Sequence, residues 1–217
     1  MPLPRVEILC SDRTHPVYAR LERWRADRAG EADIAIRDRA AQLGEGEFLF
    51  LIACQELVGP AVRGRFRHTL LIHESDLPKG RGWSPLVWQL LEGIDRVPVT
   101  LLEAEDKVDS GRIWHQLSIG FDGTELAPEI YEKLCDATIE LMDWALRNRD
   151  TVCPREQVGA ASYYRKRTPA DSEIQPESTL ADSFDLLRIA DENRYPAFFR
   201  MRGKRYRIRL DPLPEEG

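Results

Sequence analysis

Two side chains capable of acid–base chemistry stand next to predicted strands, His73 and Asp109. His73 closes the apolar run HTLLIH, and the loop HESDLPKGRGW begins there with two glycines, a proline and two cations. Asp109 opens the segment DSGR just before a second β-rich run. A histidine beside a carboxylate forms a general-base pair, because the imidazole takes a proton while the carboxylate orients the ring and stabilises the imidazolium. The residue types therefore predict proton transfer.

Each of these residues also has a purely structural interpretation. A lone histidine at a strand end is more often structural than catalytic, and an aspartate in Asp-Ser-Gly is typical of a turn in which the side chain bonds its own backbone. The position of His73 favours function, because ligands of parallel sheets bind outside the carboxyl ends of the strands. Both interpretations stay open at this level.

The elements that would position these residues alternate between strand and helix along the first two-thirds of the chain. EFLFLIAC (47–54) is almost continuously apolar, as expected for a central strand buried on both faces. The other predicted strands are 5–10, 32–36, 68–73, 97–104 and 111–120. The predicted helices are 15–28, 85–93 and 125–147. This order predicts an α/β fold, with a Rossmann-like, mostly parallel sheet and helices on both faces.

The composition changes after Arg149. We therefore expect a catalytic domain over residues 1–150, followed by a linker and a small C-terminal subdomain over 151–217. Within the latter, 180–191 is predicted as a short helix and 197–210 as a β-hairpin that turns near Gly203. The hairpin carries a stripe of Arg and Lys between residues 200 and 209.

Several classes of function are disfavoured. The turn after the first strand, CSDRTHPVY, holds no GxGxxG, and no P-loop occurs, which argues against nicotinamide or nucleoside triphosphate bound in those modes. The four cysteines lie far apart without zinc-type spacing, so no metal is predicted. No apolar run approaches the ~20 residues of a membrane helix, and no secretory signal is recognisable, so a cytoplasmic protein is expected. The net charge of −6 argues against nucleic acid, with the basic stripe as counter-evidence.

The block from His73 to Trp114 resembles the signature of the folate-dependent N-formyltransferases. In that family a histidine is followed by Ser-x-Leu-Pro, a basic residue, Arg-Gly and a helix-opening proline, and later by Val-Thr and Asp-x-Gly. The matching positions here are His73, Ser75, Leu77, Pro78, Lys79, Arg81, Gly82, Pro85, Val99, Thr100, Asp109 and Gly111. The resemblance continues in RKRTPADSEI and LLRIADENRYPAFF and covers roughly residues 45–210, closest to formyltransferases of 4-amino-4,6-dideoxy sugars.

The resemblance implies transfer of a formyl group from N10-formyltetrahydrofolate to an amine, with His73 as the base and Asp109 as its partner. It implies that the pterin slot has two walls, one around residues 52–54 and the other around residues 103–108, and that much of the contact with the pterin comes from the backbone. The slot residues so implied are Ile52, Cys54, Glu103, Glu105, Lys107 and Val108. Lys79, Arg81 and Trp83 are the candidates for contact with the acceptor.

One position departs from the family pattern. An oxyanion-donating asparagine usually stands two residues before the histidine, where this chain has Leu71. Loss of one oxyanion donor typically costs ~3 kcal/mol in the transition state. Lys79, Arg81 or a backbone N–H of the 76–82 loop is expected to replace it. Leu71 also leaves open a non-catalytic relic that binds folate or a nucleotide sugar.

The acceptor implied first is the amine of a nucleotide-linked amino sugar. The alternative is an aminoacyl group, bound to tRNA or to a carrier protein. The sequence does not identify the sugar or the nucleotide, and it leaves the oligomeric state open, a homodimer included.

Overall fold

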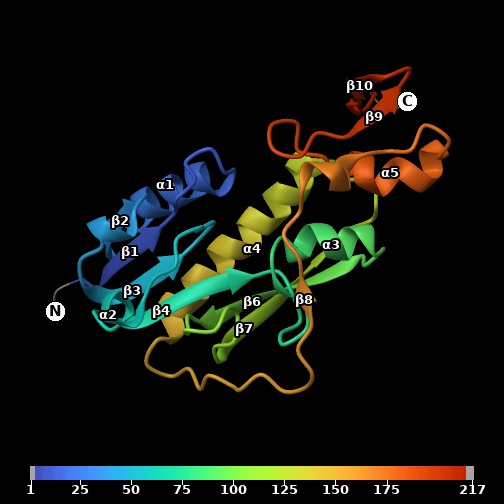
Figure 1. The fold of residues 1–217 in the computed structure, drawn as a ribbon. Coiled ribbons are helices and arrows are strands. Elements are labelled where there is room, and N and C mark those ends of the chain that lie inside the picture. Colours follow the sequence, from blue (N-terminus) through green and yellow to red (C-terminus); the bar gives the residue numbers. More distant parts are fainter. Residues whose placement is uncertain (1–2, 214–217) are drawn as a thin grey trace.

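A six-stranded sheet forms the centre of the computed structural model, which describes residues 3–213 (Figure 1). Its strand order is β2-β1-β3-β4-β6-β7. These strands are β1 (Arg5–Leu9), β2 (Asp33–Arg37), β3 (Gly46–Leu51), β4 (Phe66–His73), β6 (Arg96–Glu103) and β7 (Ile113–Gly120). The first four strands are parallel, whereas β6 is antiparallel to both β4 and β7. The predicted α/β class with a mostly parallel sheet is confirmed.

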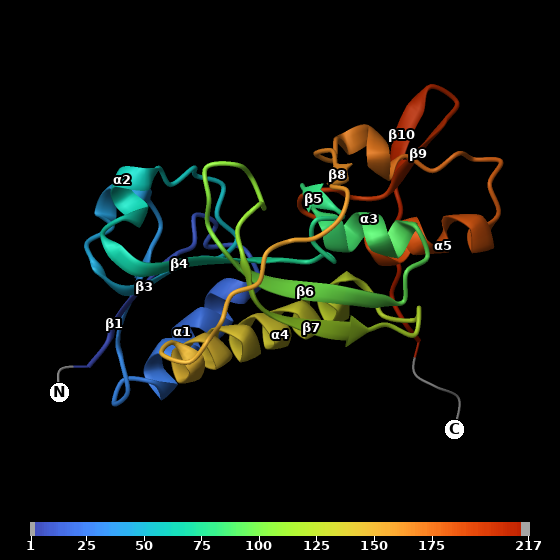
Figure 2. The ribbon, with the colours of Figure 1, turned by 90° about the horizontal axis from the view of Figure 1, so that it is seen from below.

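One face of the sheet carries the main core. Alternate residues such as Ile8, Phe50 and Leu70 point to this face and are fully buried. They pack against α1 (Val17–Asp27) and α4 (Ala127–Asn148), which lie together beneath the sheet in Figure 2. The apolar stripe of α4 explains its length of 22 residues, because it faces the sheet along the whole helix. Burying each such side chain contributes roughly 1.5–3 kcal/mol.

The opposite face is covered more thinly. Leu9 and Leu49, one residue out of phase with the main core, pack with Val58 and Phe66 beside α2 (Pro60–Arg63). Further along the same face, Leu71 and Leu102 pack with Leu77 of the loop after β4 and with Ile113. Beyond that loop come β5 (Arg81–Gly82) and α3 (Pro85–Leu91). The loop after His73 thus lies across this second face.

The segment after α4 folds back over the part of the chain that forms the sheet. Its elements are β8 (Tyr163–Tyr164), η2 (Pro169–Ser172), α5 (Leu180–Arg188), β9 (Phe198–Met201) and β10 (Lys204–Arg207). Another short 3-10 turn, η1 (Ala40–Gln42), precedes β3. β8 pairs in parallel with β5, so residues predicted as a linker supply a strand next to the loop after His73. The predicted hairpin is present and turns at Arg202 and Gly203. Over residues 3–213 no helix is long and apolar enough to cross a membrane.

Candidate active site

His73 ends β4 and is almost completely buried, with 6% of its surface exposed. Its Nε2 lies 2.8 Å from the carbonyl oxygen of Gly80. In a neutral imidazole that nitrogen must carry the proton, because a carbonyl can only accept. Nδ1 then holds the free lone pair, and it faces Asp109 Oδ2 at 3.7 Å, which is too long for a hydrogen bond. A neutral ring in this position would present its unprotonated nitrogen to a carboxylate.

Asp109 reaches His73 by an indirect route. Because β6 runs antiparallel to β4, its last residue, Glu103, pairs with Leu70 and not with His73. The loop 104–112 must therefore return across the sheet, and Asp109 sits in it with a left-handed φ of 51°. Its Oδ2 accepts the backbone N–H of Gly82 at 2.8 Å. The structure brings the two predicted residues together, while their catalytic role stays a prediction.

Residues 155–164, which we call the strap, bind the loop after His73 through hydrogen bonds. The N–H of Gly80 donates to Ser162 Oγ at 2.9 Å, and the N–H of Arg81 donates to the Ser162 carbonyl at 3.0 Å. Gly82 has a φ of 103°, and a Cβ there would lie 2.4 Å from the carbonyl oxygen of Tyr164. Only glycine fits this contact, which explains the Arg-Gly of the sequence motif.

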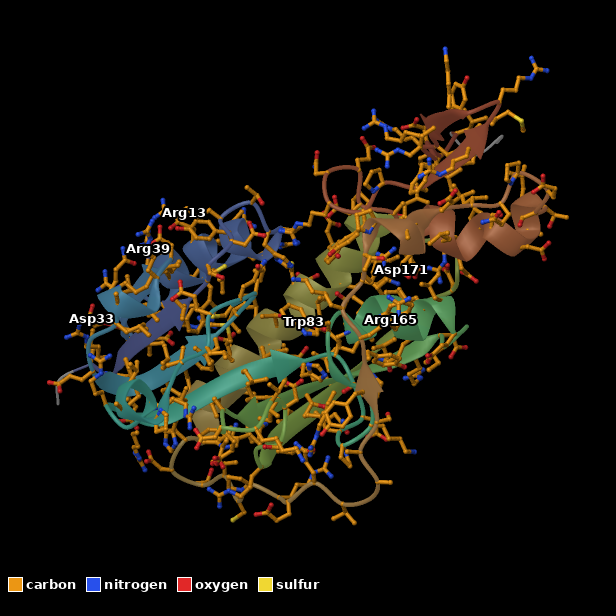
Figure 3. The ribbon with its side chains drawn as sticks, viewed as in Figure 1. Arg13, Asp33, Arg39, Trp83, Arg165 and Asp171 are labelled. Carbon is orange, nitrogen blue, oxygen red and sulfur yellow. The ribbon has the colours of Figure 1, made fainter. Side chains whose placement is uncertain are left out.

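The three candidate acceptor-binding residues have different surroundings. Arg81 is 7% exposed, and its guanidinium donates to Gln157 Oε1 at 2.5 Å and to the Tyr163 hydroxyl at 3.4 Å. Lys79 is exposed. Trp83 is 47% exposed and labelled at the centre of Figure 3, with the Lys166 ammonium 4.6 Å from its ring centroid. Lys79 and Trp83 are free to meet a ligand, whereas Arg81 is committed to the strap.

The two predicted walls of the pterin slot both adjoin α2. Cys54 and Val62 of α2 pack against the same buried cluster, and Arg63 of α2 donates to Asp106 at 2.5 Å. Across the described residues, the backbone N–H groups of 105–108 and of Cys54 make no hydrogen bond within the chain. Free backbone donors on both sides fit the amide-like edge of a pterin.

The side chains of the predicted slot residues are less distinctive. Ile52 is buried in the core, and Glu103 is held by Arg112 in a two-pronged ion pair at 2.7 and 2.9 Å. Glu105, Lys107 and Val108 are exposed. If this slot binds the donor, its contacts come from the backbone of these residues, and the roles of the side chains remain predictions.

Comparison with known proteins identifies the chain. A family described as "Formyl transferase" matches residues 8–146. The chain belongs to the formyl transferase family. One relative, the bifunctional polymyxin resistance protein ArnA of Wigglesworthia glossinidia brevipalpis, is 32% identical over 123 residues. That match covers 54% of this chain but only 18% of ArnA, so the chain corresponds to a small part of that protein.

Solved structures show the same fold. Methionyl-tRNA formyltransferase from Clostridium thermocellum superimposes with a TM-score of 0.84 at 20% identity, covering 98% of this chain and 94% of that one. A sugar N-formyltransferase from a Shewanella species gives 0.74 at 17% identity, covering 98% and 99%. HypX from Aquifex aeolicus in complex with tetrahydrofolic acid gives 0.79 at 19% identity, covering 96% and 38%.

In this formyl transferase, Leu71 stands where the family pattern has an asparagine, and its side chain is used for packing. Leu71 is partly buried against Leu77, Leu102 and Ile113, and it offers no donor to a developing oxyanion. Arg81, one of the expected replacements, points its guanidinium into the strap. The hydroxyl of Ser75 is buried and has no hydrogen-bond partner over residues 3–213. It is a buried polar group two residues from His73.

Two residues near His73, Glu74 and Gln157, were not predicted from the sequence as part of the site. Burial raises the pKa of Glu74, while the His73 imidazole lowers it and the Asp109 carboxylate raises it further. Gln157 contacts both Arg81 and the Asp109 loop. Glu74 could have been suspected as the charged neighbour of a strand-end histidine. Gln157 lies in a polar stretch without periodicity, so no sequence signal marked it.

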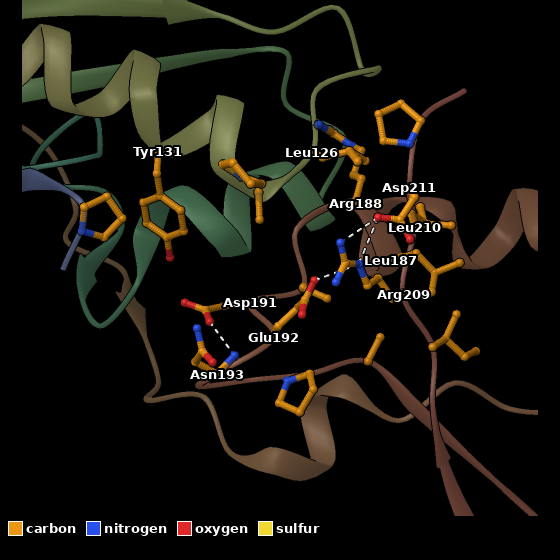
Figure 4. A pocket seen from close by; sticks show the side chains of 18 residues that line it. Leu126, Tyr131, Leu187, Arg188, Asp191, Glu192, Asn193, Arg209, Leu210 and Asp211 are labelled. Carbon is orange, nitrogen blue, oxygen red and sulfur yellow. Dashed lines mark hydrogen bonds and ion pairs between the residues drawn. The ribbon is translucent and has the colours of Figure 1, made fainter. Parts of the chain in front are cut away.

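A cavity of about 450 Å³ lies between the start of α4 and the C-terminal segment (Figure 4). Its apolar wall includes Leu126, Tyr131 and Leu210, and Arg209 forms ion pairs with Glu192 and Asp211 at its rim. None of the predicted site residues lines it. Within the described chain no group of three or more His, Cys, Asp or Glu is arranged to hold a metal.

Proposed function

We propose that this formyl transferase moves the formyl group of N10-formyltetrahydrofolate to the amine of a nucleotide-linked amino sugar. The observation that carries the proposal is the buried contact between the His73 imidazole and the Asp109 carboxylate. The family match supports formyl transfer, and the fold shared with a sugar N-formyltransferase and with a tetrahydrofolate-bound protein supports the acceptor and donor classes.

His73 supplies the step that amine attack requires. When the amine nitrogen bonds to the formyl carbon, it becomes acidic and must lose a proton. Nδ1 of His73 accepts that proton, and the resulting imidazolium lies 3.7 Å from the Asp109 carboxylate, which stabilises it. The bond from the formyl carbon to the folate nitrogen then breaks, and the departing nitrogen takes a proton back from the imidazolium. One C–N bond forms, one breaks, and the histidine ends as it began.

An aminoacyl acceptor is the second candidate, because the fold matches a methionyl-tRNA formyltransferase over nearly the whole chain. The net charge of −6 is unfavourable for a polyanionic tRNA. The exposed basic residues of β9 and β10 are the part of the surface that would have to overcome it. We therefore rank the small nucleotide sugar first.

The test is incubation with N10-formyltetrahydrofolate and a panel of UDP- and dTDP-linked 4-amino sugars, followed by mass spectrometry. A gain of one formyl group on one of them is expected. Formylation of methionyl-tRNA alone would select the second acceptor. No formylation of any acceptor, with folate still bound, would indicate the non-catalytic relic.

A further inference from the structure

The two partners of the His73 imidazole belong to two separate loops. Nε2 bonds the carbonyl of Gly80 in the loop after β4, whereas Nδ1 faces Asp109 in the loop between β6 and β7. The position of the ring relative to its carboxylate therefore depends on how far apart these loops are held. One direct link is the Gly82 N–H bond to Asp109 Oδ2, which uses the carboxylate itself.

Gln157 of the strap bonds to both loops with one side-chain amide. Its Nε2 donates to the carbonyls of Asp109 and Gly111, each at 2.8 Å. Its Oε1 accepts from Arg81 Nη2 at 2.5 Å. The opposite amide orientation would set NH₂ against a guanidinium and an oxygen against two carbonyls, so only one assignment is possible. Both N–H groups of the amide thus bind the loop of Asp109, and its oxygen binds Arg81 at the end of the loop after β4.

The strap fixes this side chain from both ends. On one side, Arg155 exchanges two backbone hydrogen bonds with Ile113, at 2.8 and 2.9 Å. On the other, β8 pairs with β5, and Ser162 binds the peptide groups of Gly80 and Arg81. Gln157 therefore sits on a short segment anchored next to each loop, as a rigid positioning group requires.

We propose that Gln157 is a positioning residue that sets the spacing between the Gly80 carbonyl and the Asp109 carboxylate, and so the tautomer and orientation of His73. It touches the backbone of Asp109, not the reacting atoms. Asp109 has a left-handed φ, which aspartate tolerates better than most non-glycine residues, and the carbonyl of this same residue accepts the hydrogen bond from Gln157. The kinetic part of this inference rests on the proposed function, whereas the structural part does not.

The kinetic test compares Gln157→Ala, Gln157→Glu and Val158→Ala. A misplacement of about 1 Å costs about 100-fold in rate. We therefore expect kcat of Gln157→Ala to fall 10- to 100-fold, with the KM for the folate donor changing less than 3-fold and the pH–rate profile displaced. Gln157→Glu keeps the acceptor for Arg81 but sets a carboxylate oxygen against two carbonyls, so it should not rescue. Val158 is 86% exposed on the same strap, and its alanine variant should match the wild type.

A second measurement needs no substrate. In protein labelled with ¹⁵N-histidine, the two ring-nitrogen shifts of His73 report which nitrogen carries the proton, and His73→Asn assigns the signals. The wild type should show one dominant tautomer protonated at Nε2. Gln157→Ala should show a mixture, with circular dichroism unchanged.

The outcomes separate the two proposals. Wild-type kcat and an unchanged His73 tautomer in a folded Gln157→Ala protein would overturn the positioning role. Rescue by Gln157→Glu would also overturn it, since Arg81 alone would then account for the residue. A shifted tautomer in a protein that formylates no acceptor would support the positioning role and refute the proposed function. If Gln157→Ala does not fold, the isosteric Gln157→Glu decides by the same tautomer readout.

Discussion

At the scale of single residues, His73 and Asp109 are the side chains whose removal should affect chemistry more than folding. His73→Asn removes the proton acceptor, and Asp109→Asn keeps an oxygen for the Gly82 N–H but removes the charge that stabilises the imidazolium. A general base contributes ~10²–10⁴ in rate. We expect kcat to fall within that range for both, measured with the best acceptor of the panel.

The matched control is Asp76→Asn, an exposed carboxylate in the same loop as His73. Its kcat should stay near that of the wild type. Wild-type turnover in either His73→Asn or Asp109→Asn, with normal circular dichroism, would refute the roles assigned to them.

Glu74 gives a pH-dependent prediction with a definite sign. Burial raises the pKa of Glu74, so the folded protein holds this proton more tightly than the unfolded chain. Ionising Glu74 therefore destabilises the fold above the ordinary glutamate pKa of about 4.3. Glu74→Gln should raise the Tm at pH 7 and leave it nearly unchanged at pH 4, by differential scanning calorimetry. If the Tm of Glu74→Gln at pH 7 were lower than that of the wild type, the fold would instead stabilise the charged form of Glu74.

The sequence could indicate His73 and Asp109 because their residue types carry proton chemistry and the motif spacing is retained. It could not indicate Gln157. The partners of its side chain lie 48 and 76 positions away in the chain, and a glutamine in a polar stretch without periodicity looks like a solvated linker. What makes Gln157 informative is its three contacts, which exist only in the folded chain.

At the scale of elements, the pairing of β5 with β8 depends on Gly82. Alanine there would place a Cβ 2.4 Å from the Tyr164 carbonyl oxygen and would require a φ near 103°. Both effects push the strap away from the active-site loop, and the strained φ alone costs about 1–3 kcal/mol. Gly82→Ala should therefore lower the free energy of unfolding by at least about 2 kcal/mol and cut kcat at least tenfold.

Gly120→Ala provides the comparison, because a Cβ at Gly120 meets nothing within 4 Å and its φ is not positive. Urea unfolding should place it within ~0.5 kcal/mol of the wild type. Equal stability of Gly82→Ala and Gly120→Ala would show that the strap tolerates displacement.

The contact of α1 with α4 contains an ion pair that should titrate in acid. Burial opposes ionisation of Asp143, but hydrogen bonds from Arg28 and the Trp24 indole outweigh it and lower the pKa of Asp143. The ion pair therefore stabilises the fold fully above the ordinary aspartate pKa of about 3.9. This stabilisation is lost as the pH falls through the lower pKa that Asp143 has in the folded protein. Asp143→Asn should cost about 2 kcal/mol at pH 7 and progressively less below pH 4.

Asp136→Asn is its control, since Asp136 is 67% exposed and sits 3.5 Å from Arg20. Denaturant titrations at pH 7 and pH 3 should show a change below ~1 kcal/mol for that variant. A cost for Asp143→Asn that is the same at both pH values would contradict the assigned ion pair.

Periodicity predicted the main helices and strands well, because each buries one regular face. It could not give the direction of β6. An apolar run reads the same whether its strand is parallel or antiparallel, and the connection of 22 residues between His73 and Arg96 is long enough for either direction. The return of the 104–112 loop to His73 is a consequence of that direction.

At the scale of the whole molecule, the division at residue 150 can be tested directly. Val152 and Ile189 pack on the main core, the Trp88 indole donates to the Arg165 carbonyl, and the strap anchors both loops around His73. A fragment of residues 1–150 would expose these surfaces and lose the strap. We expect it to lack a cooperative thermal transition, whereas the full chain shows one.

A fragment of residues 1–178 separates the two contributions, because it keeps the strap and η2 but loses α5 and the hairpin. It should unfold cooperatively at a reduced Tm and show the His73 tautomer of the full chain by ¹⁵N NMR, since each contact that fixes the imidazole lies before residue 165. If instead the 1–150 fragment unfolds cooperatively near the wild-type Tm, residue 150 is a true domain boundary. The strap would then not be required for residues 1–150 to fold.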